Sequence, residues 1–422
     1  MRINLHSLLL IVLSIFLTAC VTNPVTGKKQ FTTMSPEDEI AMGTQNYRPS
    51  QQAQGGQYQV DPALTTYVQS VGKKLAKLSD RPDLPYEFVV LNNDVPNAWA
   101  MPGGKLAINR GLLVYLQDEA QLAAVLSHEI VHAAARHGAQ QQTQGTLLGL
   151  GTLVVGVAAA QKKPEYGIAA VGAMGVGAQA WQSKYSRDHE TQSDTVGIKY
   201  MHAAGYDPQA AVELQEIFLS LQEGKEPGFL EGLFASHPPS KARIAANRQQ
   251  AAQYTGGVRN KSQYQKAIAQ LLKDKPAYEK FEKAQQAMGK KNYIDAQALI
   301  DQAIQQQPRE NLFWDLKGEA LLRQEKPAEA IKALTKSIDY NPQYFKPYIM
   351  RGIAYQATKQ TDLAEKDLLT SQRYLPTQVA AYYLGEVYLS KGNRSKASEY
   401  FQQAAQAGGE LGEAATKKME SL

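Results

Sequence analysis

Two histidines four residues apart carry the clearest chemistry in the chain, in the segment His128-Glu129-Ile130-Val131-His132. Residues at positions i and i+4 lie on the same face of a helix, so both imidazoles can reach one metal ion. Glu129 lies between them, next to the place where a metal would activate water. The chain has only 1 cysteine, which excludes a thiolate cluster, so any metal must be held by histidine and carboxylate.

The elements around this motif predict a helix that presents it. Asp118 and Gln121 form a plausible capping pair at the start of a long helix, and we expect Gly138 to end it. Strands are predicted at residues 86–91 and 105–109, with a Pro-Gly-Gly turn before the second. The strand at Lys105–Asn109 could bind an extended substrate by β-addition.

The third metal ligand determines the class of peptidase. A metzincin would carry glycine at position 135 and histidine at 138, but this chain has Ala135 and Gly138. His137 lies about 140° round the helix from His132, so we expect it to face the surface or cap the helix. The segment SRDHETQSD at 186–194 offers Glu190 as a ligand and Asp194 as the acceptor for a ligand histidine's second ring N–H. The alternative is that this acidic pair lies on a solvated helix face.

Composition excludes several functional classes. The chain has 422 residues, 43% of them hydrophobic, which suits two or three packed domains. Its 45 basic and 40 acidic side chains give a net charge of +5 without a basic block, so we expect no nucleic-acid partner.

The N-terminus has the order of a secretory signal peptide. Arg2 precedes an apolar stretch from Leu8 to Leu17, which is too short for a stable transmembrane span. The following Leu17-Thr18-Ala19-Cys20 resembles the lipobox of bacterial lipoproteins, which implies that Cys20 is acylated. No aspartate follows Cys20, which in this resemblance implies sorting to the outer membrane. An ordinary signal peptide with an incidental cysteine is the alternative.

Two glycine- and alanine-rich apolar runs flank a polar turn within residues 145–180. Neither reaches the roughly 18 apolar residues of a membrane-spanning helix. We expect a close-packed buried helical hairpin; a hairpin that touches the membrane is the alternative.

The C-terminal third repeats with a period of 34 residues, as Pro308, Pro342 and Pro376 show. This period, with small residues at equivalent positions, resembles the tetratricopeptide repeat. We place four repeats within 277–411 and expect them to stack into an α-solenoid whose concave face binds peptide or protein. A purely structural role is the alternative.

Four motifs in order resemble one family: NAWAMPGG at 97–104, HEIVHAAARHG at 128–138, SRDHETQSD at 186–194 and SHPPSKARI at 236–244. Together they are similar to the zinc metallopeptidases that include CAAX prenyl endopeptidases and mitochondrial Oma-type proteases. TNPVTGKKQ at 22–30 is similar to the exported lipoprotein members. The resemblance implies a mainly α (α+β) fold: a zincin-like gluzincin domain with a small β-sheet, then the repeat solenoid. The prenyl branch has spanning helices that this chain lacks, so we do not expect prenylated substrates.

Carried over by position, the resemblance implies that His128, His132 and Glu190 ligate one zinc ion, with Glu129 as general base. It also implies that His237 is a fourth ligand that keeps the enzyme latent. Alternatively, His237 or Arg243 could donate a hydrogen bond to the oxyanion of the transition state. A turn at His237 and a structural ion pair at Arg243 are the non-catalytic alternatives.

The resulting function is a zinc-dependent endopeptidase, lipid-anchored on the periplasmic face of the outer membrane. We expect it to degrade unfolded or misassembled outer-membrane proteins, with chaperone-like activity, and to meet the β-barrel assembly machinery through its repeats. A repeat-based chaperone or assembly scaffold with a latent protease site is the alternative. The domains expected are a signal peptide (1–19), a lipidated tether (20–34), a peptidase (35–255), a helical linker (256–276), the repeats (277–411) and a tail (412–422).

Overall fold

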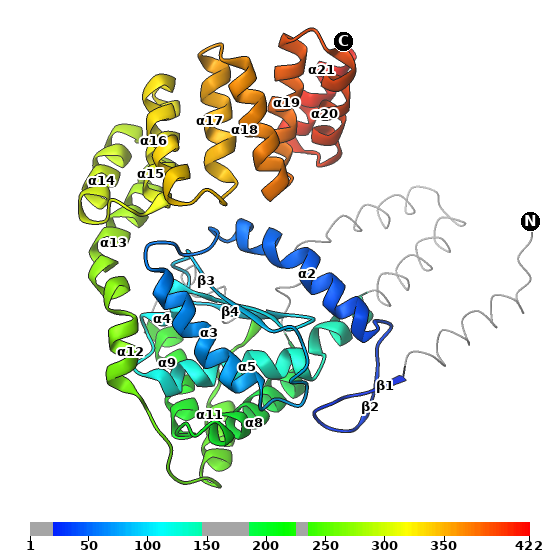
Figure 1. Cartoon of the computed structure of the whole chain (residues 1–422), viewed down its shortest axis with the longest axis vertical. Helices are drawn as coiled ribbons and strands as arrows, with labels where there is room; N and C mark the ends of the chain where they lie inside the picture. Colours follow the sequence, from blue (N-terminus) through cyan, green and yellow to red (C-terminus); the bar gives the residue numbers. More distant parts are fainter. Residues whose placement is uncertain (1–19, 146–184, 225–234) are drawn as a thin grey trace, which may run out of the picture. The chain divides into compact units, whose positions relative to one another are not determined.

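The computed structural model describes residues 20–145, 185–224 and 235–422, and these form two compact units (Figure 1). Unit 1 contains the sheet and the HEIVH helix. Unit 2 contains the C-terminal helices. Unit 1 comprises residues up to Tyr47, Ala63–Val90 and Asp94–Ile268; unit 2 comprises Arg48–Pro62, Leu91–Asn93 and Ala269–Leu422. The fold is mainly helical with small sheets, as predicted.

The sheet of unit 1 has three strands: β3 (Glu87–Leu91), β4 (Ala98–Met101) and β5 (Lys105–Asn109), in the order β3-β5-β4. Strands β4 and β5 are antiparallel, with Ala98 opposite Ile108. The middle strand β5 is buried along its whole length, so the expectation that Lys105–Asn109 adds a substrate strand is wrong. Strand β4 is one of the two outer strands of this sheet, and among the described strands it pairs with β5.

Helix α5 (Glu119–Ala134) runs through the interior of unit 1, and its residues are buried on every face except at His128. Its start is as predicted, because the Asp118 carboxylate accepts from the Gln121 N–H at 2.9 Å. Helix α8 (Arg187–Ala203) crosses it closely: a Cβ added at Gly197 would lie 3.2 Å from Ser127 Oγ. Helices α9 (Gln209–Gly224) and α11 (Lys241–Ala251) pack beside this pair.

Helix α5 ends before Gly138, contrary to the sequence expectation. Its last residue is Ala134, and Arg136 takes a left-handed conformation with φ of 65° before helical backbone resumes at His137. This conformation is uncommon for a non-glycine residue. It is held by the Arg136 guanidinium, which bonds the buried Glu39 carboxylate and the Met34 carbonyl. The chain therefore bends sharply just after the second histidine of the motif.

The N-terminal part of the described chain forms a small hairpin and two helices. The hairpin pairs β1 (Cys20–Thr22) with β2 (Lys29–Phe31), and α2 (Pro36–Ala53) and α3 (Pro62–Ala76) follow. Ser35 caps α2, accepting from the Asp38 N–H at 3.0 Å. The predicted signal peptide lies outside the described residues, as does all but the first residue of the 145–180 segment. In the described chain no helix is both long and apolar enough to span a membrane.

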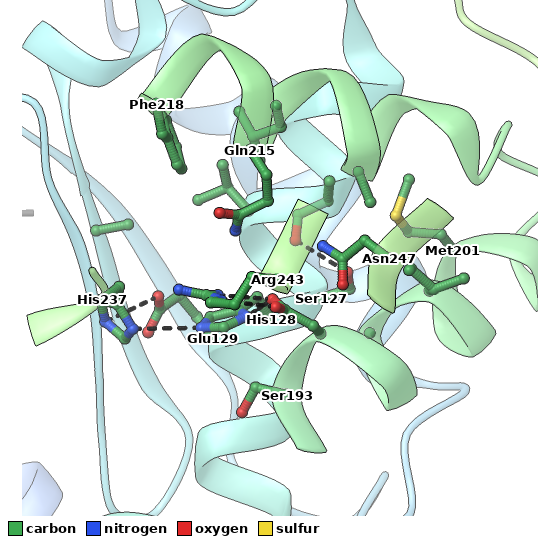
Figure 2. A pocket seen from close by; sticks show the side chains of 18 of the residues that line it. Ser127, His128, Glu129, Ser193, Met201, Gln215, Phe218, His237, Arg243 and Asn247 are labelled. Carbon is green, nitrogen blue, oxygen red and sulfur yellow. Dashed lines mark hydrogen bonds and ion pairs between the residues drawn. The ribbon is translucent and has the colours of Figure 1, made fainter. Parts of the chain in front are cut away.

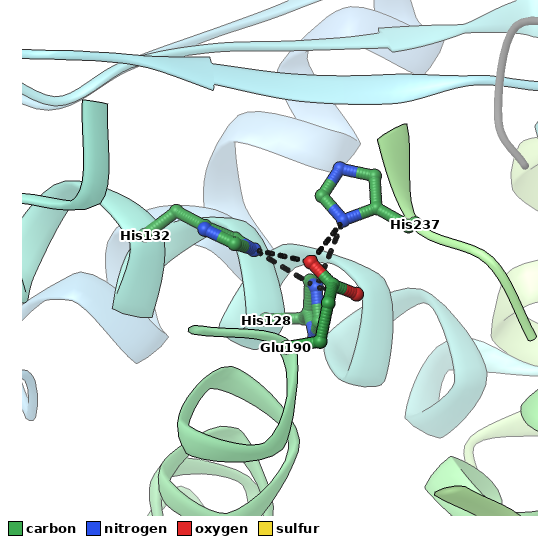
Figure 3. Close-up of side chains that lie close together, drawn as sticks. All are labelled: His128, His132, Glu190 and His237. Carbon is green, nitrogen blue, oxygen red and sulfur yellow. Dashed lines mark hydrogen bonds and ion pairs between the residues drawn. The ribbon is translucent and has the colours of Figure 1, made fainter. Parts of the chain in front are cut away.

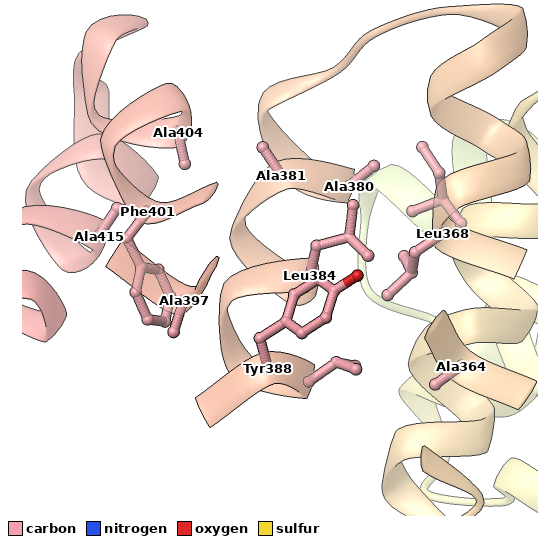
Figure 4. Close-up of a cluster of buried hydrophobic side chains, with 12 residues drawn as sticks. Ala364, Leu368, Ala380, Ala381, Leu384, Tyr388, Ala397, Phe401, Ala404 and Ala415 are labelled. Carbon is pink, nitrogen blue, oxygen red and sulfur yellow. The ribbon is translucent and has the colours of Figure 1, made fainter. Parts of the chain in front are cut away.

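Unit 2 is a stack of antiparallel helix pairs, as the 34-residue period predicted. Equivalent glycines allow the two helices of successive pairs to approach closely: a Cβ at Gly318 would lie 2.4 Å from Leu334 Cγ, and Gly352 meets Leu368 in the same way. Figure 4 shows the core near the last pairs. The helices are α13 (Ala269–Gly289), α14 (Tyr293–Gln306), α15 (Asn311–Arg323), α16 (Pro327–Tyr340), α17 (Lys346–Ala357), α18 (Thr361–Tyr374), α19 (Gln378–Ser390), α20 (Arg394–Gln406) and α21 (Gly409–Glu420).

Unit 2 also includes two short segments from early in the chain, 48–62 and 91–93. The Asn92 amide donates to Glu310 Oε1 at 2.7 Å, at the start of α15. Gln52 Oε1 accepts from the Phe345 N–H at 2.9 Å, at the start of α17. Residues 48–62 and 91–93, from the N-terminal half of the chain, therefore belong to the same compact unit as the repeats. Helix α12 (Lys261–Ala267) belongs to unit 1.

Candidate metal centre

Four side chains converge in unit 1, and their ligand atoms all lie within 4.8 Å of one another (Figure 3). His128 and His132 come from successive turns of α5, and Glu190 comes from the first turn of α8. His237 lies in the turn before α11. The structure thus brings together the three expected ligands and the residue expected as a fourth.

The separations between the donor atoms suit a tetrahedral metal ion. His128 Nε2 lies 3.1 Å from His132 Nε2 and 3.3 Å from His237 Nδ1. Glu190 Oε1 lies 3.3 Å from His132 Nε2 and 2.9 Å from His237 Nδ1. Zinc bonds of ~2.0–2.1 Å put the corners of a tetrahedron about 3.4 Å apart. Three imidazole nitrogens and one carboxylate are the donor types that zinc prefers.

A carboxylate and a guanidinium fix the orientation of His128 and Glu190. Asp194 Oδ1 lies 3.0 Å from His128 Nδ1, so that ring can donate to the carboxylate and keep Nε2 free for a metal. Arg243 bonds both oxygens of Asp194, at 2.8 and 2.7 Å, and its Nη1 lies 2.8 Å from Glu190 Oε2. Asp194 thus lies where the sequence expected it, and Arg243 pairs with two buried carboxylates.

These contacts set the charges of the buried groups when no metal is bound. Burial alone lowers the pKa of His128, but Glu190 and Asp194 outweigh it and raise that pKa to about 10. Burial lowers the pKa of His132 well below its ordinary value. Although burial opposes it, His237 and His128 hold the pKa of Glu190 well below the usual range, so this carboxylate is ionised.

Glu129 lies beside the cluster and is 3% exposed. Its Oε2 is buried and has no hydrogen-bond partner within the described residues, while Oε1 lies 3.6 Å from His237 Nε2. An unpaired buried carboxylate oxygen is costly unless water or a ligand satisfies it. Its place therefore fits a group that acts on a water molecule at the site.

His137 is part of the site, contrary to the expectation of a surface or capping residue. It is fully buried, and its Nδ1 lies 3.0 Å from His132 Nδ1. The expectation assumed a continuous helix, whereas the bend at Arg136 turns His137 back toward His132. Burial, and then the neighbouring His189, lower the pKa of His137 to about 3, so it is neutral. The sequence analysis also missed Tyr185, whose ring stacks on His132 with centroids 3.9 Å apart.

A cavity extends from His128 and Glu129 between α5, α8 and α9 (Figure 2). Its walls are mainly apolar, and Ala98 of the edge strand β4 contributes to them. Gln215 is 6% exposed and points into this space with its Oε1 unpaired within the described residues. The cavity therefore extends from Glu129 to Ala98 of strand β4.

Comparison with known proteins identifies the domain that carries this site. Residues 62–251 match the model described as peptidase family M48. They form an M48 metallopeptidase domain. Residues 281–344 match a tetratricopeptide-repeat model. The predicted combination of a metallopeptidase and these repeats is therefore confirmed.

Several curated proteins are similar to this chain over much of its length. A β-barrel assembly-enhancing protease of Escherichia coli K12 is 27% identical over 352 residues, which cover 77% of this chain and 71% of that protein. Its Yersinia pestis counterpart is 29% identical over 344 residues, 75% of this chain and 69% of that one. The mitochondrial metalloendopeptidase OMA1 of Schizosaccharomyces pombe is 31% identical over 222 residues, 52% and 63% of the two chains.

Proposed function

We propose that the chain is a zinc endopeptidase in which His128, His132 and Glu190 hold one zinc ion and Glu129 is the general base. The observation that carries this is the set of buried N and O donors at tetrahedral separations beside an unpaired carboxylate. Zinc supplies a Lewis acid that polarises the scissile carbonyl and lowers the pKa of water. Glu129 then accepts the proton of the attacking water and delivers it to the leaving amine.

The residues around the ligands hold the site in a productive geometry. Asp194 orients the imidazole of His128, and Arg243 neutralises the adjoining negative charge of Asp194 and Glu190. Four N–H groups of Arg243 face Asp194, Glu190 and the Pro238 carbonyl. We therefore assign Arg243 a structural ion-pairing role rather than donation to the oxyanion.

His237 acts in this proposal as a fourth ligand that keeps the enzyme latent. Its Nδ1 lies among the donor atoms, and its Nε2 faces Glu129 at 3.6 Å. The His237 ring thus occupies the space between the ligand atoms and Glu129, where an attacking water would have to lie. Cleavage then requires His237 to move away, which exposes Glu129 to water and substrate.

The substrate we propose is an extended segment of an unfolded or misassembled outer-membrane protein. Strand β4 is an outer strand of the sheet and contributes Ala98 to the cavity beside Glu129. An unfolded β-barrel precursor exposes strands that can pair with such an edge. The similarity to bacterial β-barrel assembly-enhancing proteases supports a role in β-barrel assembly.

The location we propose is the periplasmic face of the outer membrane. Its support is the lipobox-like sequence before Cys20, which predicts an acylated N-terminus, together with the relatives' names. We propose that the repeats bind substrate proteins or the β-barrel assembly machinery. A bound substrate protein would then be either degraded or assisted by chaperone-like activity.

A second candidate function is an assembly scaffold whose protease site is largely latent. The observation that favours it is the fourth donor, His237, in contact with Glu190 and facing Glu129. In that case the repeats would supply most of the activity in the cell.

Replacement of Glu129 by Gln separates these functions. Removal of a general base lowers the rate by ~10²–10⁴-fold, so the variant should bind zinc but fail to cut a denatured outer-membrane β-barrel protein. A matched control is Glu37→Gln, an exposed carboxylate in α2. Unchanged cleavage by Glu129→Gln would refute the assigned base. Lost cleavage with full rescue of an envelope-assembly defect would favour the scaffold.

A further inference from the structure

The two histidines of the motif have different partners on the side away from the ligand cluster. His128 Nδ1 faces the Asp194 carboxylate at 3.0 Å. His132 Nδ1 instead faces another imidazole nitrogen, Nδ1 of His137, also at 3.0 Å. Ligand histidines in metal sites usually donate this second N–H to a carboxylate, a carbonyl or water. The partner of His132 is therefore an unusual one.

The contact between the two Nδ1 atoms allows only one proton, because one nitrogen must donate and the other accept. If His132 Nε2 holds the metal, its Nδ1 carries hydrogen and donates to His137 Nδ1. The proton of His137 then lies on Nε2, which is 3.2 Å from Gln192 Oε1. A chain of donors and acceptors thus runs from the ligand through His137 to a neutral amide of α8.

His137 is held rigidly in the position that this chain requires. The left-handed turn at Arg136 directs it back toward α5, and the Glu39 carboxylate fixes that turn. On its other face the ring stacks on His189, with centroids 4.1 Å apart and planes 14° from parallel. Because His137 is fully buried, the Nδ1 of His132 faces its ring and not bulk solvent.

We propose that His137 is a positioning residue that fixes the tautomer and orientation of His132 by accepting its Nδ1–H. The proposal rests on the zinc site proposed above, and it extends the site to a residue that touches no substrate or metal. Asp194 supplies a charged acceptor to one ligand histidine, and His137 supplies a neutral acceptor to the other. His137 should therefore strengthen zinc binding without adding negative charge.

The test compares three substitutions by their zinc dissociation constants, measured by competition with a chelator. Asn in place of His137 keeps an acceptor oxygen near the position of Nδ1, whereas Gln places its polar atoms near Nε2 and Leu has none. Loss of a second-sphere partner typically weakens metal binding 10–100-fold. We expect the zinc dissociation constant to rise by that factor in His137→Gln and His137→Leu. In His137→Asn it should stay within about threefold of the wild-type value.

A second readout is the visible absorption of the cobalt(II)-substituted protein, which reports the geometry of the ligands. It should change in His137→Gln and His137→Leu and return toward wild type in His137→Asn. A merely structural role would give no such difference between Asn and Gln, because both are polar and uncharged. Equal zinc affinity in all three variants and wild type would overturn the proposal, as would an equal loss in all three.

Two controls keep the outcomes distinguishable. Failure of wild type to bind zinc, or unchanged binding after His128→Ala, would refute the zinc site itself rather than the role of His137. If the His137 variants do not fold, Gln192→Leu tests the next step of the chain, because it removes the acceptor of His137 Nε2–H. We expect Gln192→Leu to weaken zinc binding several-fold, and unchanged binding there would overturn the proposal.

Discussion

In the proposed latent state, His237 and Glu129 together determine whether the site can admit water. His237 Nε2 lies 3.6 Å from Glu129 Oε1, and its Nδ1 contacts Glu190. Hydrogen bonds to charged groups contribute about 1.5–3 kcal/mol, so their removal corresponds to roughly a ten- to hundredfold change. His237→Ala should raise cleavage of a denatured substrate by that factor with zinc retained. The control is His202→Ala, an exposed histidine elsewhere in unit 1. Lower activity with zinc retained would instead support a transition-state donor.

Zinc binding should release a proton from His128. Without metal, Glu190 and Asp194 raise the pKa of His128 to about 10 against the effect of burial, so it is protonated at pH 7. A histidine that ligates a metal must be neutral, so its proton leaves on binding and zinc affinity rises with pH up to about 10. Calorimetry in buffers of different ionisation enthalpy should give about one proton released at pH 7. A binding enthalpy independent of the buffer would contradict this assignment.

The bend after α5 is the element that the sequence could not reveal. Local patterns predicted where several side chains lie in the structure. These patterns are the HEIVH spacing, the Asp118 cap and the i,i+4 pair of Glu190 and Asp194. The left-handed turn at Arg136 depends instead on Glu39, which is 97 residues away in the chain. The expectation that Lys105–Asn109 binds a substrate strand failed for a similar reason, because the tertiary fold places β5 between β3 and β4.

The buried carboxylate of Glu39 should contribute strongly to the stability of unit 1. It is 1% exposed and pairs with Arg136 and Arg81. Removal of one partner from a buried ion pair costs about 3–5 kcal/mol, so Glu39→Ala should lower the free energy of unfolding by that amount. Glu37→Ala, in the same first turn of α2 but exposed, should change it by less than about 0.5 kcal/mol. Equal effects in urea unfolding would contradict the role of Glu39.

At the scale of the whole molecule, the chain combines a peptidase unit with a repeat unit. The 34-residue period was sufficient to predict the solenoid, because equivalent small residues recur at the helix crossings, as Gly318 and Gly352 do. No local pattern marked residues 48–62 and 91–93 as part of the repeat unit. Their contacts with α15 and α17 join positions about 220 to 290 residues apart, such as Asn92 with Glu310.

The glycine crossings offer a test confined to the repeat unit. A Cβ at Gly318 would lie 2.4 Å from Leu334 Cγ, and such overpacking costs about 1–3 kcal/mol. Gly318→Ala should therefore destabilise the repeats while leaving the zinc content unchanged. Gly289→Ala is the matched control, since no atom lies within 4 Å of its Cβ. Hydrogen exchange should show faster opening of α15 and α16 in the first variant only, and equal exchange would contradict the crossing.

The measurement that tests the central claim most directly is a crystal structure of the zinc-loaded chain with anomalous data at the zinc edge. We predict one peak per chain, within about 2.1 Å of His128 Nε2, His132 Nε2 and a Glu190 oxygen. Glu129 should lie beside that peak without bonding it. A peak elsewhere in the chain, or none at these three residues in protein that still cuts its substrate, would contradict the proposed zinc site.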